Sequence, residues 1–295
     1  MENLEQCPLC KNRGLNTFLN VPDHYLTKEV FTLTRCTHCG FAFTNPRPNP
    51  NELGRYYGSS NYISHSNRAR GLVPALYYLA RSIALRAKRR MIARLTSGKT
   101  VLDYGCGAGA FLAHMRSCGY TVEGVEPGDE ARAIARRTAS CPVHPSLADL
   151  TQHRFDVITL WHVLEHVPDP TQTLLQLTSL LSPNGILLIA VPDVSSWDSQ
   201  HYGSLWAALD VPRHLSHFRP RDLHHLAGQS GLRLALTKRL WFDALYISML
   251  SERYAGRGPI PALVLGLAKG TYSNLVALST GRSTSSMLYV LKKTH

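Results

Sequence analysis

The sequence predicts an α/β protein with a doubly wound parallel sheet, preceded by a small module that is rich in cysteine. Two observations predict it. Short apolar strands alternate with helices from Lys99 onward, and two Cys-x-x-Cys pairs lie within the first 40 residues. Such β/α alternation with short turns is typical of parallel sheets that carry helices on both faces. The 295 residues, 44% of them hydrophobic, suffice for one domain of ordinary size and an appendage.

The first residues and the cysteines predict a location in the cytoplasm. The segment from Met1 to Gln6 is polar and acidic, so it lacks the basic region, apolar run and cleavage site of a secretory signal. In a reducing compartment, paired cysteines are metal ligands more often than disulfides. We therefore expect a cytoplasmic protein.

The net charge of +12, from 32 basic and 20 acidic residues, favours an anionic partner such as nucleic acid, a membrane surface or an acidic small molecule. Basic residues gather in two regions without acids, which are 64–102 and the part of the chain after Glu252. Both regions also contain many apolar residues, as helices that lie on a membrane surface do. We expect these regions to contact a membrane or a lipid-like acceptor. A solvated basic face over ordinary core packing is the simpler alternative.

Turn signals divide the chain into three regions. We expect a metal-binding module over 1–62, a basic helical connector over 63–98, and an α/β domain over 99–295 with insertions at about 194–218 and 243–284. No internal repeat or low-complexity tract interrupts this order.

One long apolar stretch, Ile260 to Leu278, lies in the second insertion. A membrane-spanning helix needs about 20 mostly apolar residues. The stretch is interrupted by Pro261, Gly266, Lys269 and Gly270. We therefore do not expect it to span a membrane.

The hydrophobic pattern predicts individual strands and helices. The expected strands are Thr100–Asp103, Tyr120–Glu126, Phe155–Trp161, Ile186–Val191, Leu232–Leu240 and Ser286–Lys293. The expected helices are Gly71–Leu95, Phe111–Gly119, Asp129–Ala139, Pro170–Leu181 and Pro220–Gly231, with Pro183-Asn184-Gly185 as the turn that closes the fourth.

A glycine loop follows the first of these strands. Gly105, Gly107 and Gly109 occupy alternate positions between the strand and the next helix. Glycines let a backbone approach a ligand closely, and open α/β sheets bind ligands at the carboxyl ends of their strands. The second strand ends in Glu126, an acid placed to bind both hydroxyls of a ribose. A tight turn without a ligand is the alternative for the glycines alone.

The spacing of the loop favours a cationic ligand over a nicotinamide dinucleotide. The dinucleotide fingerprint is Gly-x-Gly-x-x-Gly. Here the spacing is Gly-x-Gly-x-Gly, and Asp103 precedes it. An acid before the loop is poorly suited to a pyrophosphate, whereas it suits the sulfonium of a nucleoside amino acid.

At these residues the sequence resembles the class I S-adenosylmethionine-dependent methyltransferases, whose first motif is Asp-x-Gly-x-Gly-x-Gly. The resemblance implies a Rossmann-like seven-stranded sheet with an antiparallel last strand, and S-adenosylmethionine as the cofactor. It implies that the glycines line the methionine moiety, that Asp103 orders the loop, and that Glu126 holds the ribose. The other residues that it implies at the cofactor are Leu147, Ala148 or Asp149 at the edge of the adenine, and Trp161 and His162 after the fourth strand.

Two further segments resemble small-molecule methyltransferases of this class. The segment 161–170 contains the His-Val-Leu-Glu-His stretch of ubiquinone-type and sugar-type enzymes. The segment 210–218 matches the Pro-Arg-His-Leu-x-His-Phe pattern of a bacterial subgroup, in which it covers the substrate side. Methylases of nucleic-acid bases commonly carry Asn or Asp, then Pro-Pro and an aromatic residue, after the fourth strand. This chain does not, which argues against methylation of a base amino group.

Methyl transfer from a sulfonium is an in-line displacement, so the protein mainly supplies alignment and a base for the acceptor. Histidine has a suitable pKa for that base. The candidates are His162, His166 and His214, with Glu165 or Asp210 as orienting partners. We expect His166, His214 and Asp210 on the catalytic side and His162 in packing or at the cofactor. Any of the histidines could instead be an ordinary surface or capping residue.

The four N-terminal cysteines predict a structural zinc site. Cys7 and Cys10 form one Cys-x-x-Cys pair, and Cys36 and Cys39 form the second, with Gly40 after it. Each pair can form a tight turn that directs two thiolates at one tetrahedral ion. Four thiolates close the coordination sphere, so this metal would stabilise structure and take no part in catalysis.

The leading interpretation is a methyltransferase that acts on an oxygen or carbon of a sugar, a lipid-linked molecule or a natural product. An RNA methyltransferase is the second interpretation, because of the cysteine module and the basic helix, although we consider nucleic acid the less favoured partner. A zinc-ribbon binding protein with an inert Rossmann-like domain is the third. Asp103, the three glycines and Glu126 count against inertness.

Overall fold

The computed structural model describes residues 1–57, 72–150 and 152–294. It contains a four-stranded sheet in the order β1-β2-β3-β9 and a seven-stranded sheet in the order β10-β11-β8-β7-β4-β5-β6. The predicted α/β class with a seven-stranded sheet is therefore confirmed. The chain divides into two compact units, which are described separately: the first contains 1–58, 162–174 and 189–290, and the second contains 59–161, 175–188 and 291–295.

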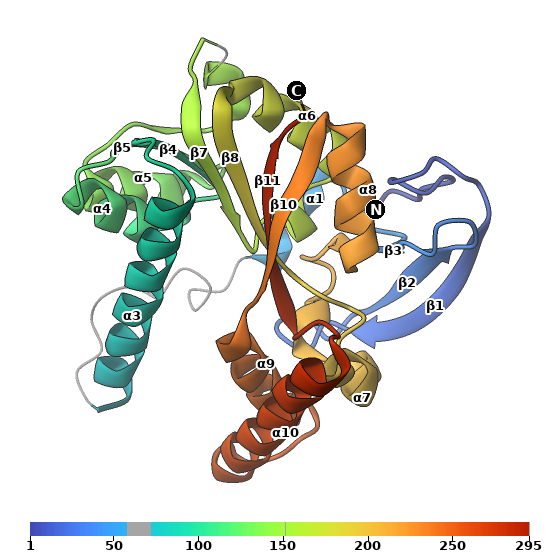
Figure 1. The fold of residues 1–295 in the computed structure, drawn as a ribbon. Coiled ribbons are helices and arrows are strands. Elements are labelled where there is room, and N and C mark those ends of the chain that lie inside the picture. The colour runs from blue at the N-terminus through green and yellow to red at the C-terminus, as the bar shows by residue number, and fades with distance from the viewer. Residues whose placement is uncertain (58–71, 151, 295) are drawn as a thin grey trace. The chain divides into compact units, whose positions relative to one another are not determined.

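The second unit contains the parallel strands that follow the connector. β4 pairs with β5 and with β7, and β5 pairs with β6, all in parallel. The strands are β4 (Thr100–Tyr104), β5 (Thr121–Val125), β6 (Val143–His144) and β7 (Phe155–Trp161), and the helices are α3 (Leu72–Leu95), α4 (Ala110–Ser117) and α5 (Asp129–Ala139). α4 packs against β5 and α5, beside which it lies in Figure 1.

From α3 to β7, the predicted bounds of helices and strands agree with the structure to within two residues. α5 begins with Asp129 and Glu130 and ends with Arg136 and Arg137, an arrangement of charge that stabilises a helix at both ends. The start of the connector, at 63–71, lies outside the described residues.

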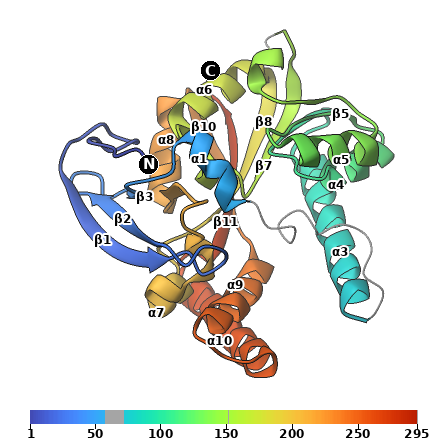
Figure 2. The same cartoon turned by 180° about the vertical axis from the view of Figure 1, so that it is seen from behind.

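The first unit contains the small antiparallel sheet, whose strands β1 (Leu15–Pro22), β2 (Val30–Cys36) and β3 (Ala42–Thr44) run side by side in Figure 2. Its fourth strand, β9 (Ser216–His217), pairs with β3 although it lies far along the chain. Phe31 and Leu33 of β2 share a buried core with Trp206, Leu209 and Ile247. The cysteine-containing sheet therefore packs on the first insertion.

β11 (Ser286–Lys293) lies between β10 (Leu232–Arg239) and β8 (Leu181–Pro192) in the larger sheet. The amide of Leu240, just after β10, donates to the carbonyl of Ser286 at the start of β11. The amide of Asp193, just after β8, donates to the carbonyl of Ser285. The start of β11 therefore lies beside the ends of β10 and β8. The last strand runs antiparallel to both neighbours, as expected.

One predicted turn is wrong. Pro183-Asn184-Gly185 lies inside β8, which begins directly after α6 (Pro170–Leu180). A Cβ on Gly185 would lie 3.0 Å from the carbonyl oxygen of Phe155. The glycine thus allows close packing of two backbones and does not mark a loop.

The second insertion is a pair of helices, α9 (Trp241–Tyr254) and α10 (Pro259–Thr280), which lie side by side in Figure 1. Pro261 falls in the first turn of α10, where a missing amide costs little, so the helix is continuous through the apolar stretch. Within the described parts of the chain, no helix is long and apolar enough to cross a membrane. The remaining helices are α1 (Pro50–Leu53), α7 (Trp197–Tyr202) and α8 (Pro220–Gln229), and short 3-10 turns include η2 (Leu147–Leu150) and η3 (Leu164–His166).

Candidate functional site

The glycine loop between β4 and α4 has the conformation that its sequence predicts. Gly105, Gly107 and Gly109 have φ angles of 72°, 53° and 78°, in the left-handed region that disfavours other residues. The amide of Gly105 donates to the carbonyl of Val125 at 2.8 Å, which holds the loop at the carboxyl end of β5. A Cβ on Gly109 would lie 2.9 Å from the Cα of Ala135, whereas one on Gly107 would meet nothing within 4 Å. Gly109 therefore serves packing against α5, and Gly107 leaves open space.

Asp103 lies beneath this loop and is 3% exposed. Thr159 of β7 donates to its Oδ1 atom at 2.6 Å. Burial raises the pKa of Asp103 to about 7, although the hydrogen bond from Thr159 and the charge of Lys88 oppose the shift. With this pKa, the protonated carboxyl group of Asp103 loses its proton easily when a cationic ligand binds beside it.

A pocket of about 270 Å³ opens at the loop. Asp103, Gly105 and Gly107 line one side of it, and Trp161 lies edge-on to Phe111 with ring centroids 5.6 Å apart. The residues that line the pocket are Arg81, Ala84, Leu85, Lys88, Asp103, Gly105, Cys106, Gly107, Ala108, Ala110, Phe111 and Trp161. The expected residues Asp103, Gly105, Gly107 and Trp161 are thus brought together.

The connector helix α3 supplies side chains that the motifs did not identify. Arg81 and Lys88 lie on the pocket side of α3, two turns apart. The Lys88 ammonium lies 3.8 Å from the centroid of the Trp161 ring. Two cations and an acid therefore face one pocket, which suits a ligand that carries charges of both signs. In the sequence, only the spacing of basic and apolar residues in α3 could have indicated that this helix contributes to the pocket.

Glu126 and Asp149 are not among the described residues that line this pocket. The Glu126 carboxylate accepts hydrogen bonds from the amides of Gly107 at 2.9 Å and Gly128 at 3.0 Å. It therefore braces the glycine loop. Asp149 is exposed in η2 and accepts a long hydrogen bond from Ser146, while Leu147 is buried and Ala148 exposed. Their roles at a ribose and an adenine stay predictions.

The first unit contains a cluster of histidines around a buried carboxylate. Glu165 is 1% exposed, and neither of its oxygens has a hydrogen-bond partner in the described part of the chain. The rings of His166 and His214 meet at 84° with centroids 4.5 Å apart. The Nε2 atom of His214 lies 4.0 Å from Glu165 and 4.0 Å from Asp210. Both histidines predicted for the catalytic side and Asp210 are thus neighbours.

A backbone carbonyl fixes which nitrogen of His214 is free. His214 Nδ1 lies 2.9 Å from the carbonyl of Ala208, and a carbonyl only accepts, so Nδ1 is the donor and the neutral ring keeps a lone pair on Nε2. His166 Nδ1 lies between two oxygens, 3.0 Å from the carbonyl of Arg213 and 2.9 Å from the hydroxyl of Tyr57. Burial, and next the neighbouring His166, hold the pKa of His214 well below its ordinary value. His214 is therefore an unprotonated, pre-oriented base.

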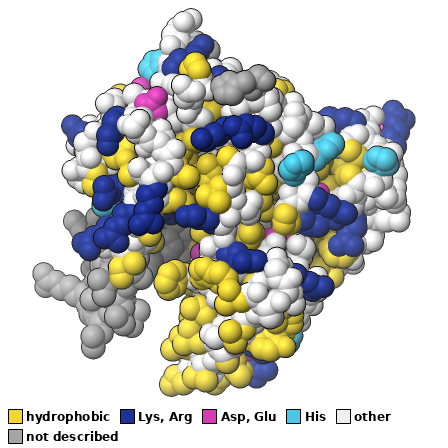
Figure 3. Space-filling model, in the orientation of Figure 1, with side chains coloured by type: hydrophobic (Ala, Val, Ile, Leu, Met, Phe, Trp, Pro, Cys, Tyr) yellow, Lys and Arg dark blue, Asp and Glu magenta, His cyan; other side chains and the backbone are white. Residues whose placement is uncertain are grey.

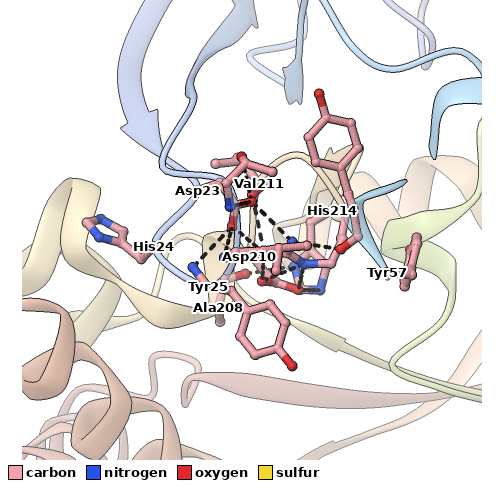
Figure 4. A network of polar contacts seen from close by, with 12 residues as sticks. Asp23, His24, Tyr25, Tyr57, Ala208, Asp210, Val211 and His214 are labelled. Atoms are coloured by element: carbon pink, nitrogen blue, oxygen red, sulfur yellow. Dashed lines mark hydrogen bonds and ion pairs between the residues drawn. The ribbon is translucent and has the colours of Figure 1, made fainter. Parts of the chain in front are cut away.

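The loop that carries His214 is held by a buried ion-pair network (Figure 4). The Arg213 guanidinium is fully buried and donates to Asp23 at 2.8 Å and to Asp210 at 2.7 Å. Thr44 of β3 donates to the carbonyl of His214 at 2.8 Å. The turn after β1 and the strand β3 therefore position the predicted catalytic segment, an arrangement that the sequence did not reveal.

His162 lies between two acids of the same unit. Its Nε2 is 3.1 Å from Asp243 of α9, and its Nδ1 is 3.5 Å from Glu165. Burial opposes its charge, but these two carboxylates raise the pKa of His162 to about 10. A histidine that is already protonated at neutral pH cannot serve as a base. This agrees with its assignment outside the catalytic set, and its position beside a cofactor stays a prediction.

Among the described residues, two sets of side chains have metal-binding geometry. Glu165, His166 and His214 bring three ligand atoms within 4.8 Å of one another. Cys7, Cys10, Cys36 and Cys39 do the same with four sulfurs, of which two pairs are 3.6 Å apart. Sulfurs about 3.8 Å apart are expected around a tetrahedral zinc with bonds of about 2.3 Å. The amide of Gly40, whose φ is +71°, donates to the carbonyl of Cys36 and closes the second turn. The four cysteines therefore fit a zinc ion.

Comparison with known proteins agrees with the fold. The model of a methyltransferase-domain family matches residues 76–237, more than half of the chain. The chain belongs to this family, and it is an S-adenosylmethionine-dependent methyltransferase of class I.

The chain is similar in sequence to two bacterial ubiquinone biosynthesis O-methyltransferases. With that of Idiomarina loihiensis it is 29% identical over 172 residues, which are 53% of this chain and 70% of the relative. With that of Neisseria meningitidis serogroup C it is 27% identical over 175 residues, 54% of this chain and 71% of the relative. These matches cover about half of the chain.

Solved structures share the fold. The magnesium protoporphyrin IX methyltransferase of Synechocystis PCC 6803 has a TM-score of 0.53 at 14% identity, covering 83% of this chain and all of that one. A putative sarcosine dimethylglycine methyltransferase of Galdieria sulphuraria has a TM-score of 0.51 at 15% identity, covering 73% and 86%. At these identities the likeness concerns the fold.

Proposed function

We propose that this enzyme transfers the methyl group of S-adenosylmethionine to an oxygen or carbon of a small-molecule acceptor. The observation that carries the proposal is the pocket in which buried Asp103 faces an open glycine loop. Its acid, its two cations and its aromatic pair complement a ligand with a sulfonium, an amino-acid group and a flat base. Glu126 would hold the ribose, Gly105, Gly107 and Gly109 the methionine moiety, and Asp149 and His162 would complete the cofactor site.

His166, His214 and Asp210 are proposed as the catalytic groups. Bound S-adenosylmethionine would supply the methyl group to the acceptor and would leave as a neutral thioether once its carbon–sulfur bond breaks. The attacking hydroxyl becomes strongly acidic during this step, so a base with a low pKa suffices to take its proton. His214 presents such a base at Nε2, with Asp210 and His166 beside it.

The acceptor is proposed to be a sugar, a lipid-linked molecule or a natural product, of anionic or lipid-like character. The relatives named for ubiquinone biosynthesis and the net charge of +12 support this class. We further propose a cytoplasmic location with peripheral membrane contact. The division into a zinc-binding module at 1–62, a connector at 63–98 and a catalytic domain at 99–295 is part of the same proposal.

Binding of S-adenosylmethionine tests the function, and it is expected to depend on pH. Asp103 has a pKa of about 7 in the free protein, so it is mostly protonated at pH 6 and ionised at pH 8. A cationic ligand favours the ionised form, so the affinity should fall about tenfold from pH 8 to pH 6. Calorimetry at several pH values measures this. Asp103→Asn should bind more weakly at pH 8 and lose the pH dependence.

Failure to bind S-adenosylmethionine at any pH would sink the proposed function. Transfer of labelled methyl from the cofactor into a small-molecule extract is the matching activity assay. Label that appears in RNA and not in small molecules would favour the RNA methyltransferase instead.

We propose that Cys7, Cys10, Cys36 and Cys39 hold a structural zinc ion. Cys10→Ser should release the metal and lower the free energy of unfolding by about 3 kcal/mol or more, because the two turns lose their common ligand. Metal analysis and urea denaturation measure the two effects. Cys118→Ser, a half-buried cysteine of the other unit, is the matched control and should keep the metal. A metal-free wild type of equal stability would contradict the assignment.

A further inference from the structure

The α9–α10 hairpin exposes an unusually large apolar surface. Phe242 of α9 is 78% exposed, and Ile260 and Val264 of α10 are 76% and 60% exposed. Figure 3 shows hydrophobic side chains gathered over these two helices. The other large apolar residues on the hairpin that are exposed are Trp241, Tyr246, Leu263, Leu267, Tyr272, Leu275 and Leu278. Contiguous apolar patches of this kind mark interaction surfaces.

In α10 the small residues are buried and the large apolar residues are exposed, whereas an ordinary surface helix buries its large apolar residues. Its buried positions, which include Gly266 and Gly270, carry small residues. A Cβ on Gly266 would lie 2.4 Å from the Cα of Met249, and one on Gly270 would lie 2.6 Å from the carbonyl oxygen of Ala244. The helices are thus in close backbone contact. The large side chains, at helical spacing on the opposite side, point away from the protein, so core packing does not explain them.

The charged residues of the hairpin are basic where they are exposed. Arg253 and Arg257 lie exposed at the turn between the helices. The acid Glu252 is 1% exposed and paired with both Lys269 and Arg257, so these three groups together keep a positive charge. Asp243 is paired with His162. No acid follows Glu252 in the sequence. The exposed surface therefore combines apolar residues with positive charge.

We propose that the α9–α10 hairpin docks on an anionic lipid bilayer and lies in its interface. The apolar side chains would enter the boundary between headgroups and acyl chains, and the arginines would contact anionic headgroups. Neither helix is long and apolar enough to cross the bilayer. Charge complementarity favours a bilayer over a second copy of the chain, because two copies would bring Arg253 and Arg257 against like charges.

The hairpin is joined to the proposed catalytic side. Asp243, in the first turn of α9, contacts His162, which in turn contacts Glu165. A docked hairpin would thus hold the histidine cluster beside the bilayer, where a lipid-linked acceptor resides. The inference rests on the proposed function only for this last step, since docking itself requires no cofactor.

Flotation with vesicles tests the docking. The wild type should float with vesicles of phosphatidylcholine and phosphatidylglycerol, and much less with phosphatidylcholine alone. Val264→Glu should weaken the partitioning by about tenfold or more, because it removes an apolar side chain and adds a negative charge. Arg253→Gln with Arg257→Gln should weaken it by about fivefold per arginine.

Matched controls lie elsewhere on the chain. Val30 of β2 is 64% exposed, so Val30→Glu makes the same exchange at similar exposure and should leave flotation unchanged. Arg137→Gln with Arg154→Gln removes two exposed charges of the other unit and should have little effect. Circular dichroism of each variant shows that it is folded.

Absence of flotation by the wild type, or equal losses for Val264→Glu and Val30→Glu, would overturn the proposal. A dimer in sedimentation that Val264→Glu dissociates, without flotation, would assign the surface to a second copy instead. The outcome of the cofactor-binding assay is independent of flotation. A chain that floats but binds no cofactor would support the docking surface and contradict the proposed function.

Discussion

Arg213→Met is expected to lower the free energy of unfolding by about 3–5 kcal/mol. The guanidinium of Arg213 is fully buried and pairs with Asp23, which is also fully buried, and with Asp210. Methionine approximates the volume but leaves Asp23 as a buried charge without its partner, and breaking one side of a buried pair costs this amount. Urea denaturation followed by circular dichroism measures the loss.

Lowering the pH should remove the stability that the ion pair of Asp23 with Arg213 gives the wild type. Burial opposes ionisation of Asp23, but the hydrogen bond from Arg213 and the amides of the turn lower its pKa to about 2. A carboxyl whose pKa is lower in the folded state contributes stability above its unfolded pKa of about 4. That contribution should be lost as the pH falls from about 4 to 2.

Arg221→Met is the matched control for the arginine, because Arg221 is exposed. It should change the free energy of unfolding by about 0.5 kcal/mol or less. If the two variants lose equal stability, or Arg213→Met loses none, the buried pair does not hold the two segments together.

The parts of the fold that the sequence predicts are those fixed by local contacts. The strand β4, the glycine loop and α5 follow from patterns of a few residues, because neighbours along the chain set their conformation. Gly105 and Gly107 needed a positive φ, and only the spacing of glycines was required to find them. The cysteine pairs are equally local, since each closes its own turn.

For the proposed acceptor site around Glu165, His166 and His214, the sequence predicted the types of residue but not how they are arranged. His166 and His214 were identified from their motifs, but the tautomer of His214 depends on the carbonyl of Ala208, which no motif includes. The pairing of Asp23 with Arg213 joins residues 190 positions apart. Such contacts arise from tertiary packing of the small sheet on the first insertion.

The role of each histidine also depends on its surroundings, and sequence alone makes them equivalent. His162 is clamped by Asp243, an acid of the second insertion, and so becomes cationic. His214 lies where burial keeps it neutral. The same type of side chain is therefore a cation at position 162 and neutral at position 214, where we propose that it acts as the base.

His214→Gln is expected to lower kcat by about 10²- to 10⁴-fold, the range that a positioned general base contributes. Glutamine fits the volume of the ring but cannot accept the proton that the acceptor loses during methylation. Binding of S-adenosylmethionine should stay unchanged, because no residue that lines the glycine pocket is altered. Labelled-methyl transfer into the small-molecule extract measures the rate, and calorimetry measures the binding.

His217→Gln is the control that separates chemistry from folding. His217 lies three residues away, is equally buried, and contacts Thr44 at 3.2 Å, outside the contacts that join Glu165, His166 and His214. Its loss should cost stability but reduce kcat only a few-fold. A His214→Gln variant that transfers methyl at the wild-type rate would exclude His214 as the base. His166, whose ring meets that of His214, would then be the remaining histidine of the cluster for that role, because His162 is already protonated.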